Sequence, residues 1–113
     1  MNLFNRLYYS SVLFTNDMKH IHTHAIGEKF DRIHSIANEY YEKANENSDT
    51  FAELALEYKE NIDNASNVTK YVRYSVEQAD KYDFARAVNA IETKGKAYIS
   101  AMEEVRFSGS IPT

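Results

Sequence analysis

Apolar residues recur at helical intervals along the first part of the chain. They follow steps of three, four and seven residues at Leu3, Leu7, Phe14, Met18 and Ile21. Such steps place side chains on one face of an α-helix, so we expect a helix from about Leu3 to Thr23. The sole glycine in the first half of the chain, Gly27, predicts that the chain turns there.

The next apolar pattern is longer and repeats every seven residues. Its members are Phe30, Ala37, Ala44, Phe51 and Tyr58, and the intervening heptad positions hold Ile33, Tyr40 and Leu54. The repeat keeps one phase across the polar stretch 45–48. We therefore predict one continuous second helix from Phe30 to Tyr58, which would be about 45 Å long.

The remaining sequence predicts two further helices. Asx and Ser residues at 61–67 predict a loop. A short third helix follows, with inward-facing residues at Val68, Val72, Val76 and Ala79. Asp83 is a suitable N-cap for a fourth helix, which extends from Phe84 to Val105. We expect an all-α, antiparallel four-helix bundle as a single domain over 1–107, followed by a mobile tail over 108–113.

Composition narrows the class of protein. The 113 residues include no cysteine, one proline and three glycines. This excludes an all-β fold, which needs frequent turns, and it excludes disulfide and thiolate chemistry. The sequence has no apolar run of membrane-spanning length and no signal peptide, so we expect a cytoplasmic protein without a membrane partner. The net charge of −4 and the absence of a basic stripe disfavour DNA binding.

The predicted third helix is too short to cover the long second helix. Part of the second helix is therefore expected to be covered by another subunit. A short chain also buries a smaller share of its surface than a long one, which favours association. We expect a homo-oligomer that contains at least a two-fold dimer.

Histidine and carboxylate residues give the sequence its candidate chemistry. His20 and His24 share one helix face, and so do Asp49 and Glu53. The chain has no HExxH motif and no paired ExxH motif, which excludes the zinc-protease and the usual di-iron bundle patterns. A more informative set is His22, His34, Asp49 and Glu53.

Spacing along the second helix requires two chains for this set. His34 precedes Asp49 by fifteen residues, which is about 22 Å along a helix axis. Metal ligands lie about 2–2.5 Å from their ion, so these two residues of one chain cannot share one ion. Asp49 and Glu53 would have to come from a second, antiparallel copy. The two-fold axis would pass near Tyr41, Glu42 and Asn45 and would generate two sites per dimer.

The stretch around these residues resembles the Dps family of mini-ferritins, the DNA-binding proteins from starved cells. That family's motif runs from a histidine to a glycine five residues on, a phenylalanine eight on and a second histidine twelve on. An aspartate follows fifteen residues later, and a glutamate four beyond it. The matching residues here are His22, Gly27, Phe30, His34, Asp49 and Glu53.

The resemblance covers about residues 3–60 and implies a ferritin-like fold and a ferroxidase site between two-fold-related subunits. It implies iron as the metal, with zinc or manganese as substitutes, and iron storage or peroxide detoxification as the role. It leaves open a twelve-subunit shell. His20, His24, Asn38 and Tyr41 are candidates for positions beside the ligands or for holding a second metal ion.

Several positions depart from the family pattern. Thr23 replaces a frequent tryptophan, Leu54 replaces an arginine, and Asn38 replaces an aspartate that helps hold a second iron. The sequence therefore leaves open one or two ions per site. The alternative function is a non-enzymatic, ferritin-like helical oligomer with a structural or regulatory role. The family's basic DNA-binding tail is absent.

Overall fold

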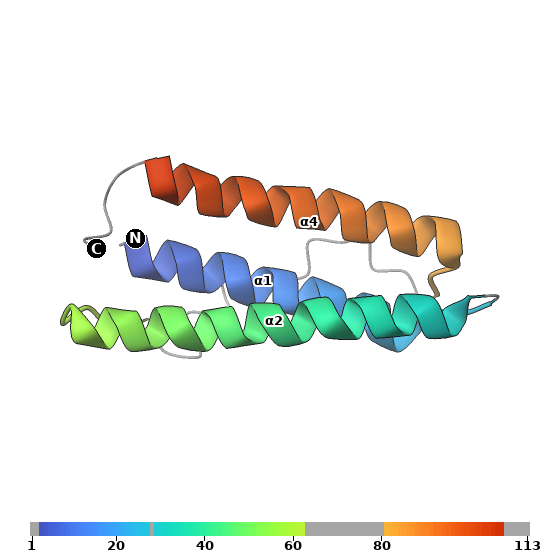
Figure 1. Cartoon of the computed structure of the whole chain (residues 1–113), viewed down its shortest axis with the longest axis horizontal. Helices are drawn as coiled ribbons and strands as arrows, with labels where there is room; N and C mark the ends of the chain where they lie inside the picture. The colour runs from blue at the N-terminus through green and yellow to red at the C-terminus, as the bar shows by residue number, and fades with distance from the viewer. Residues whose placement is uncertain (1–2, 28, 63–80, 108–113) are drawn as a thin grey trace.

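The computed structural model describes residues 3–27, 29–62 and 81–107 (Figure 1). These residues form three helices and no sheet: α1 (Leu3–His24), α2 (Phe30–Glu57) and α4 (Phe84–Phe107). The all-α fold class is thus confirmed, and the described helices begin and end close to the predicted residues. The third helix expected over 68–79 and the tail over 108–113 lie outside the described residues.

Helix α1 occupies the central position among the three described helices. It packs against both α2 and α4, whereas α2 and α4 contact each other little. Figure 1 shows α1 running antiparallel to its two neighbours. The buried face of α1 carries the predicted apolar residues, and Met18 and Ile21 are fully buried there. Opposite them, Ala37 and Ala44 of α2 are buried in the same core cluster, where small side chains permit a close helix approach.

Helix α2 is continuous through the polar stretch 45–48, as predicted. The heptad pattern was nevertheless wrong about the burial of three of its aromatic residues. Phe30, Tyr40 and Tyr58 are each about two-fifths exposed, at 41%, 42% and 40%. Three predicted members are buried, namely Ile33, Ala37 and Ala44, and the other buried residues of α2 are Ser48 and Ala55.

The buried positions of α2 repeat every eleven residues rather than every seven. Eleven residues in three turns give about 3.67 residues per turn, close to the value of a straight α-helix. A strict seven-residue repeat drifts by about 20° per heptad on such a helix. The aromatic members of the heptad therefore lie at the edge of the contact with α1, where Tyr40 reaches the ring of Phe14 at 6.5 Å and Tyr58 stacks on Phe4 at 5.7 Å.

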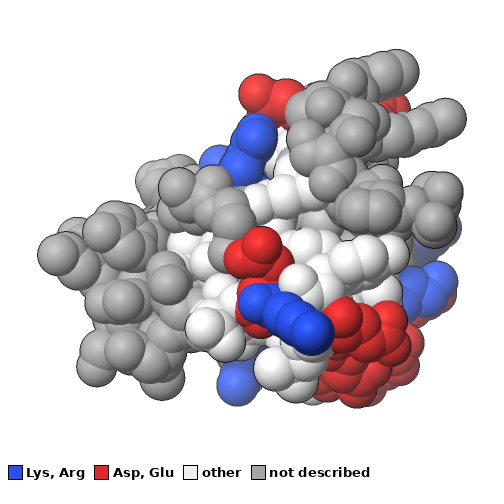
Figure 2. All heavy atoms as spheres, turned by 90° about the vertical axis from the view of Figure 1, so that its left-hand side faces the viewer, with Lys and Arg blue, Asp and Glu red and all other residues white. Residues whose placement is uncertain are grey.

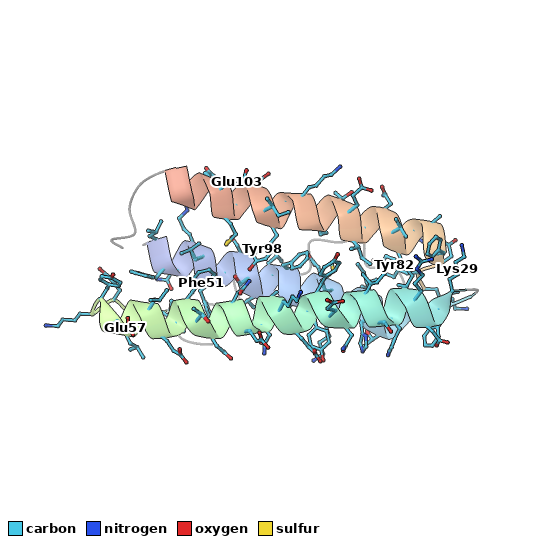
Figure 3. The ribbon with its side chains drawn as sticks, in the orientation of Figure 1. Lys29, Phe51, Glu57, Tyr82, Tyr98 and Glu103 are labelled. Atoms are coloured by element: carbon cyan, nitrogen blue, oxygen red, sulfur yellow. The ribbon has the colours of Figure 1, made fainter. Side chains whose placement is uncertain are left out.

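Tyr82 binds the α1–α2 turn through its backbone. Its backbone N–H donates to the carbonyl of His24 at 2.8 Å, and its carbonyl accepts from Ile26 at 2.9 Å. The Tyr82 side chain is 1% exposed. Figure 3 places it beside Lys29 at this turn. Gly27 adopts a positive φ of 86°, which confirms the predicted turn.

Helix α4 begins at the predicted cap. The Oδ1 atom of Asp83 accepts a hydrogen bond from the backbone N–H of Arg86 at 2.9 Å. This bond satisfies one of the donors that the first helical turn leaves without a partner. Asp83 thereby fixes where α4 starts, directly after the segment that is held against the α1–α2 turn.

Tyr98 of α4 contacts both other helices. Its hydroxyl lies 2.8 Å from Oγ of Ser11 in α1 and accepts from Nδ2 of Asn47 in α2 at 3.1 Å. Its ring stacks on Phe14 at 4.7 Å. Figure 3 labels Tyr98 between α4 and α1. Beside Tyr98, the described residues of α2 and α4 border a groove of about 530 Å³. This groove has largely apolar walls, formed by residues that include Ile36, Tyr40, Val88, Ile91 and Ile99.

Candidate metal centre

The α1–α2 turn brings His22 and His34 into direct contact. His22 lies in the last turn of α1 and His34 in the second turn of α2. Their rings stack with centroids 3.8 Å apart and an interplanar angle of 27°. Both side chains are half-buried. The predicted pairing of these two histidines within one chain is therefore present in the fold.

Reciprocal hydrogen bonds fix the ring nitrogens of this histidine pair. The Nδ1 atom of His22 lies 3.1 Å from the carbonyl oxygen of His34, and Nδ1 of His34 lies 3.0 Å from the carbonyl oxygen of His22. A carbonyl oxygen can only accept, so each Nδ1 carries the proton and donates. A neutral imidazole in this orientation has its lone pair on Nε2. Histidine ligands are held in the same way in metal sites, where the second ring nitrogen donates to a carbonyl or carboxylate.

The same contacts also serve the helices themselves. His22 belongs to the last turn of α1, where carbonyl groups have no intrahelical partner. The Nδ1–H of His34 supplies a donor to one of them. The pair therefore closes the end of α1 whether or not an ion is bound. A capping role and a ligand role use different nitrogens of the same ring.

Aromatic side chains border the histidine pair on α2. The ring of Phe30 lies 5.2 Å from His34, and the ring of Tyr41 lies 5.6 Å from His22. Asn38, one turn after His34, donates from Nδ2 to the Oε1 atom of Glu42 at 3.2 Å. Tyr41 thus contacts His22, and Asn38 contacts Glu42 one turn further along α2; a role for either beside an ion stays a prediction.

His20 and His24 form a separate pair within α1. Their ring centroids are 4.2 Å apart, and Nδ1 of His24 lies 2.7 Å from the carbonyl oxygen of His20. His20 meets the ring of Tyr82 edge-on at 5.7 Å. This pair faces the segment that precedes α4, so the structure does not join it to His22 and His34.

Asp49 and Glu53 are exposed on α2. Neither makes an ion pair with another described residue. Within the described part of the chain, no group of three or more histidine and carboxylate residues is close enough to hold an ion. One chain thus brings the two histidines together and keeps the two carboxylates apart from them. The site completed by a second chain stays a prediction.

Two structural contributors escaped the sequence analysis. Tyr98 lies within the predicted fourth helix, but the apolar pattern gave no indication that its hydroxyl bonds to α1 and α2. Tyr82 lies between the predicted third and fourth helices, yet it is one of the most buried residues described. A buried tyrosine needs a hydrogen-bond partner for its hydroxyl. The high tyrosine count of this chain was therefore the one feature of the sequence that indicated such contacts between helices.

Comparison with known proteins adds no relative to this picture. The chain matches no protein-family model, no curated protein and no solved structure. None of the described helices is long and apolar enough to cross a membrane. The resemblance to the mini-ferritins therefore rests on the residues at positions 22–53 alone.

Proposed function

We propose that this protein binds and oxidises Fe²⁺ at a site formed by two copies of the chain, as the mini-ferritins do. The observation that carries the proposal is the His22–His34 pair, whose Nδ1 atoms donate to backbone carbonyls and leave both Nε2 atoms for a metal. The carboxylates of Asp49 and Glu53 at their matching spacing would complete the site from the second copy.

The donor set suits iron as the substrate. Imidazole and carboxylate ligands bind Fe²⁺, Zn²⁺ and Mn²⁺ in preference to softer metals. Two carboxylates favour Fe³⁺ over Fe²⁺ because they add negative charge around the ion, so they make the loss of an electron easier. The electron acceptor would be O₂ or peroxide, and the product would be Fe³⁺ for storage or removal. With peroxide, two Fe²⁺ ions and two protons yield two Fe³⁺ ions and two water molecules.

The experiment follows the absorbance of oxidised iron after Fe²⁺ is added near neutral pH. Wild-type protein is compared with the double variant His34→Ala/Asp49→Ala and with the control His24→Ala. We expect the double variant to lose the protein-dependent rate and the control to retain it. Equal rates in the wild type and the double variant would contradict the proposal.

A second candidate function has one observation in its favour. Asn38 occupies the position of a family aspartate, and its amide is engaged with Glu42. A neutral amide is a weaker ligand than a carboxylate, which favours a single ion or none at this site. The second candidate is a ferritin-like helical oligomer without iron oxidation. Metal analysis of the purified protein separates the two, because the oligomer alone would carry no bound iron, zinc or manganese.

A further inference from the structure

One stripe along α2 borders the face that packs on α1. His34 and Tyr41 on this stripe contact His22 of α1, whereas Phe30, Asn45, Asp49 and Leu56 are exposed. Steps of three and four residues place eight side chains on this stripe: Phe30, His34, Asn38, Tyr41, Asn45, Asp49, Ala52 and Leu56. Glu42 and Glu53 border it, and both are exposed. Figure 2 looks at the end of the molecule where α2 terminates and shows carboxylate side chains gathered at its lower right. The groove between α2 and α4 lies on the other side of α2.

Two-fold symmetry determines which residues of this stripe would meet. In two antiparallel copies of one helix, the numbers of any two residues that face each other add up to the same value. If His34 lies opposite the segment from Asp49 to Glu53 of a second copy, that value is 83 to 87. Phe30 then lies opposite Leu56, and the axis passes between Tyr41 and Asn45. The pairing repeats on the other side of the axis, so the contact is self-complementary.

The apolar content of this contact is small. Phe30 is 41% exposed and Leu56 is 71% exposed, and they would meet at the two ends. One aromatic side chain buries about 150–250 Å² at most. A stable interface of standard size buries about 800 Å² per partner around an apolar core. Here the centre combines the ring of Tyr41, which already packs against His22, with the polar side chains of Asn38, Glu42 and Asn45.

The charges on the stripe also oppose a contact without an ion. Glu42 would lie near the Glu42 of the second copy, and its described partner is the neutral amide of Asn38. Asp49 and Glu53 have no ion-pair partner among the described residues. Like charges facing one another across an interface repel, and buried carboxylates without a counter-charge cost more still. A divalent cation placed between the carboxylates and the histidine pair would reverse both penalties.

We propose that a divalent cation assembles this dimer, and that the chain is a monomer along this face until the ion binds. The inference rests on the shared site proposed above and adds that the ion itself controls association. Two ions bind per dimer, each between the His22–His34 pair of one copy and the Asp49–Glu53 pair of the other. Binding only to the dimer tightens association by mass action: an ion at about ten times its dissociation constant at both sites tightens dimerisation about 100-fold.

The first test measures mass by sedimentation with Zn²⁺, which binds without being oxidised, and with a chelator. We expect the 13.1 kDa chain to be monomeric with the chelator and to double its mass with Zn²⁺. The variant Asp49→Asn/Glu53→Gln changes exposed positions, so its helices should be unaffected by circular dichroism. It should stay monomeric with Zn²⁺. The control Glu46→Gln removes a charge from the same helix outside the ligand set and should behave as wild type.

The second test mixes two defective variants. His22→Ala/His34→Asn lacks the histidine ligands, and Asp49→Asn/Glu53→Gln lacks the carboxylates. Each alone should remain monomeric with Zn²⁺. Their mixture should form a dimer that holds one zinc ion, because one of its two sites then has all four ligands. A site formed within one chain would give no such recovery, and that result would overturn the proposal.

The outcomes separate this inference from the proposed function. A dimer present equally with Zn²⁺ and with chelator overturns assembly by the ion, while iron oxidation that depends on His34 and Asp49 would keep the proposed function. Zinc bound by a wild-type monomer overturns the shared site. A zinc-dependent assembly larger than a dimer that Asp49→Asn/Glu53→Gln abolishes supports the inference, because that assembly contains the same contact.

Discussion

Two histidine pairs lie near the end of α1, and they differ in what holds them. His20 and His24 are one helical turn apart, so their proximity follows from the helix itself. His22 and His34 come from different helices, and each Nδ1 is bound to the other's carbonyl. The second pair therefore exists only while α1 and α2 keep their relative position. The difference shows that a rigid site comes from contacts between elements rather than from a local cluster of suitable residues.

The largest expected difference between the two pairs concerns metal affinity. His34→Ala removes a proposed ligand and the donor that holds the His22 carbonyl, so we expect Zn²⁺ to bind at least about 100-fold more weakly. His24→Ala should leave the zinc affinity within about twofold of the wild type. Competition with a chromophoric chelator measures both values. Equal losses of zinc affinity in the two variants would contradict the assignment of the ion to the His22–His34 pair.

The next difference concerns stability. His34→Ala leaves the His22 carbonyl without its donor, so we expect a loss of about 1–2 kcal/mol in the free energy of unfolding. His34→Asn keeps an amide donor close to the position of Nδ1 and should recover most of this loss without restoring zinc binding. Urea unfolding measures the first effect, and the chelator competition measures the second. If His34→Asn recovered both the stability and the zinc affinity, His34 would not be a metal ligand.

Asn38→Asp tests how many metal ions bind at the His22–His34 pair. The substitution places a carboxylate one turn after His34, so we expect the zinc content to rise from one ion towards two per site. The second ion should bind more weakly than the first because His22 and His34 are already engaged. Isothermal titration with Zn²⁺ gives the stoichiometry. An unchanged stoichiometry would mean that Asn38 is not directed at the site.

The smallest effect is expected within α1. The Thr23 hydroxyl lies 2.8 Å from Nδ1 of His24, and its single proton is shared between the carbonyls of Lys19 at 2.9 Å and His20 at 3.1 Å. Thr23 is exposed, so Thr23→Ala should change the free energy of unfolding by no more than about 0.5 kcal/mol. Zinc affinity should be unchanged. A large loss of zinc affinity in this variant would indicate that the two histidine pairs belong to one metal site.

Sequence periodicity predicted the described helices closely but misjudged some of their buried faces. The continuity of α2 through 45–48 followed from the phase of its apolar residues, and the start of α4 followed from Asp83. The exposure of Phe30, Tyr40 and Tyr58 did not follow. Which face of a straight helix is buried depends on the helix packed against it, and a seven-residue pattern assumes a supercoil that this pair does not need.

The end of α2 shows the same limit on a smaller scale. The Glu60 N–H donates to the Ala55 carbonyl and the Lys59 N–H to the Leu56 carbonyl, with Lys59 at a φ of 58°. This is the hydrogen-bond pattern of a helix end that usually carries glycine at the left-handed position. Lysine there gives no indication in the sequence, because the backbone conformation is imposed by the turn and not by the residue.

The sequence by itself determined the helical class, the spans of the described helices and the separation of about 22 Å between His34 and Asp49 along α2. These properties are local, since helix periodicity and rise depend on neighbouring residues. The tertiary structure decided that His22 meets His34, which of their nitrogens are occupied by backbone carbonyls, and that His20 and His24 belong to another surface. These properties depend on how two helices are placed against each other, which the spacing of residues along one chain does not specify.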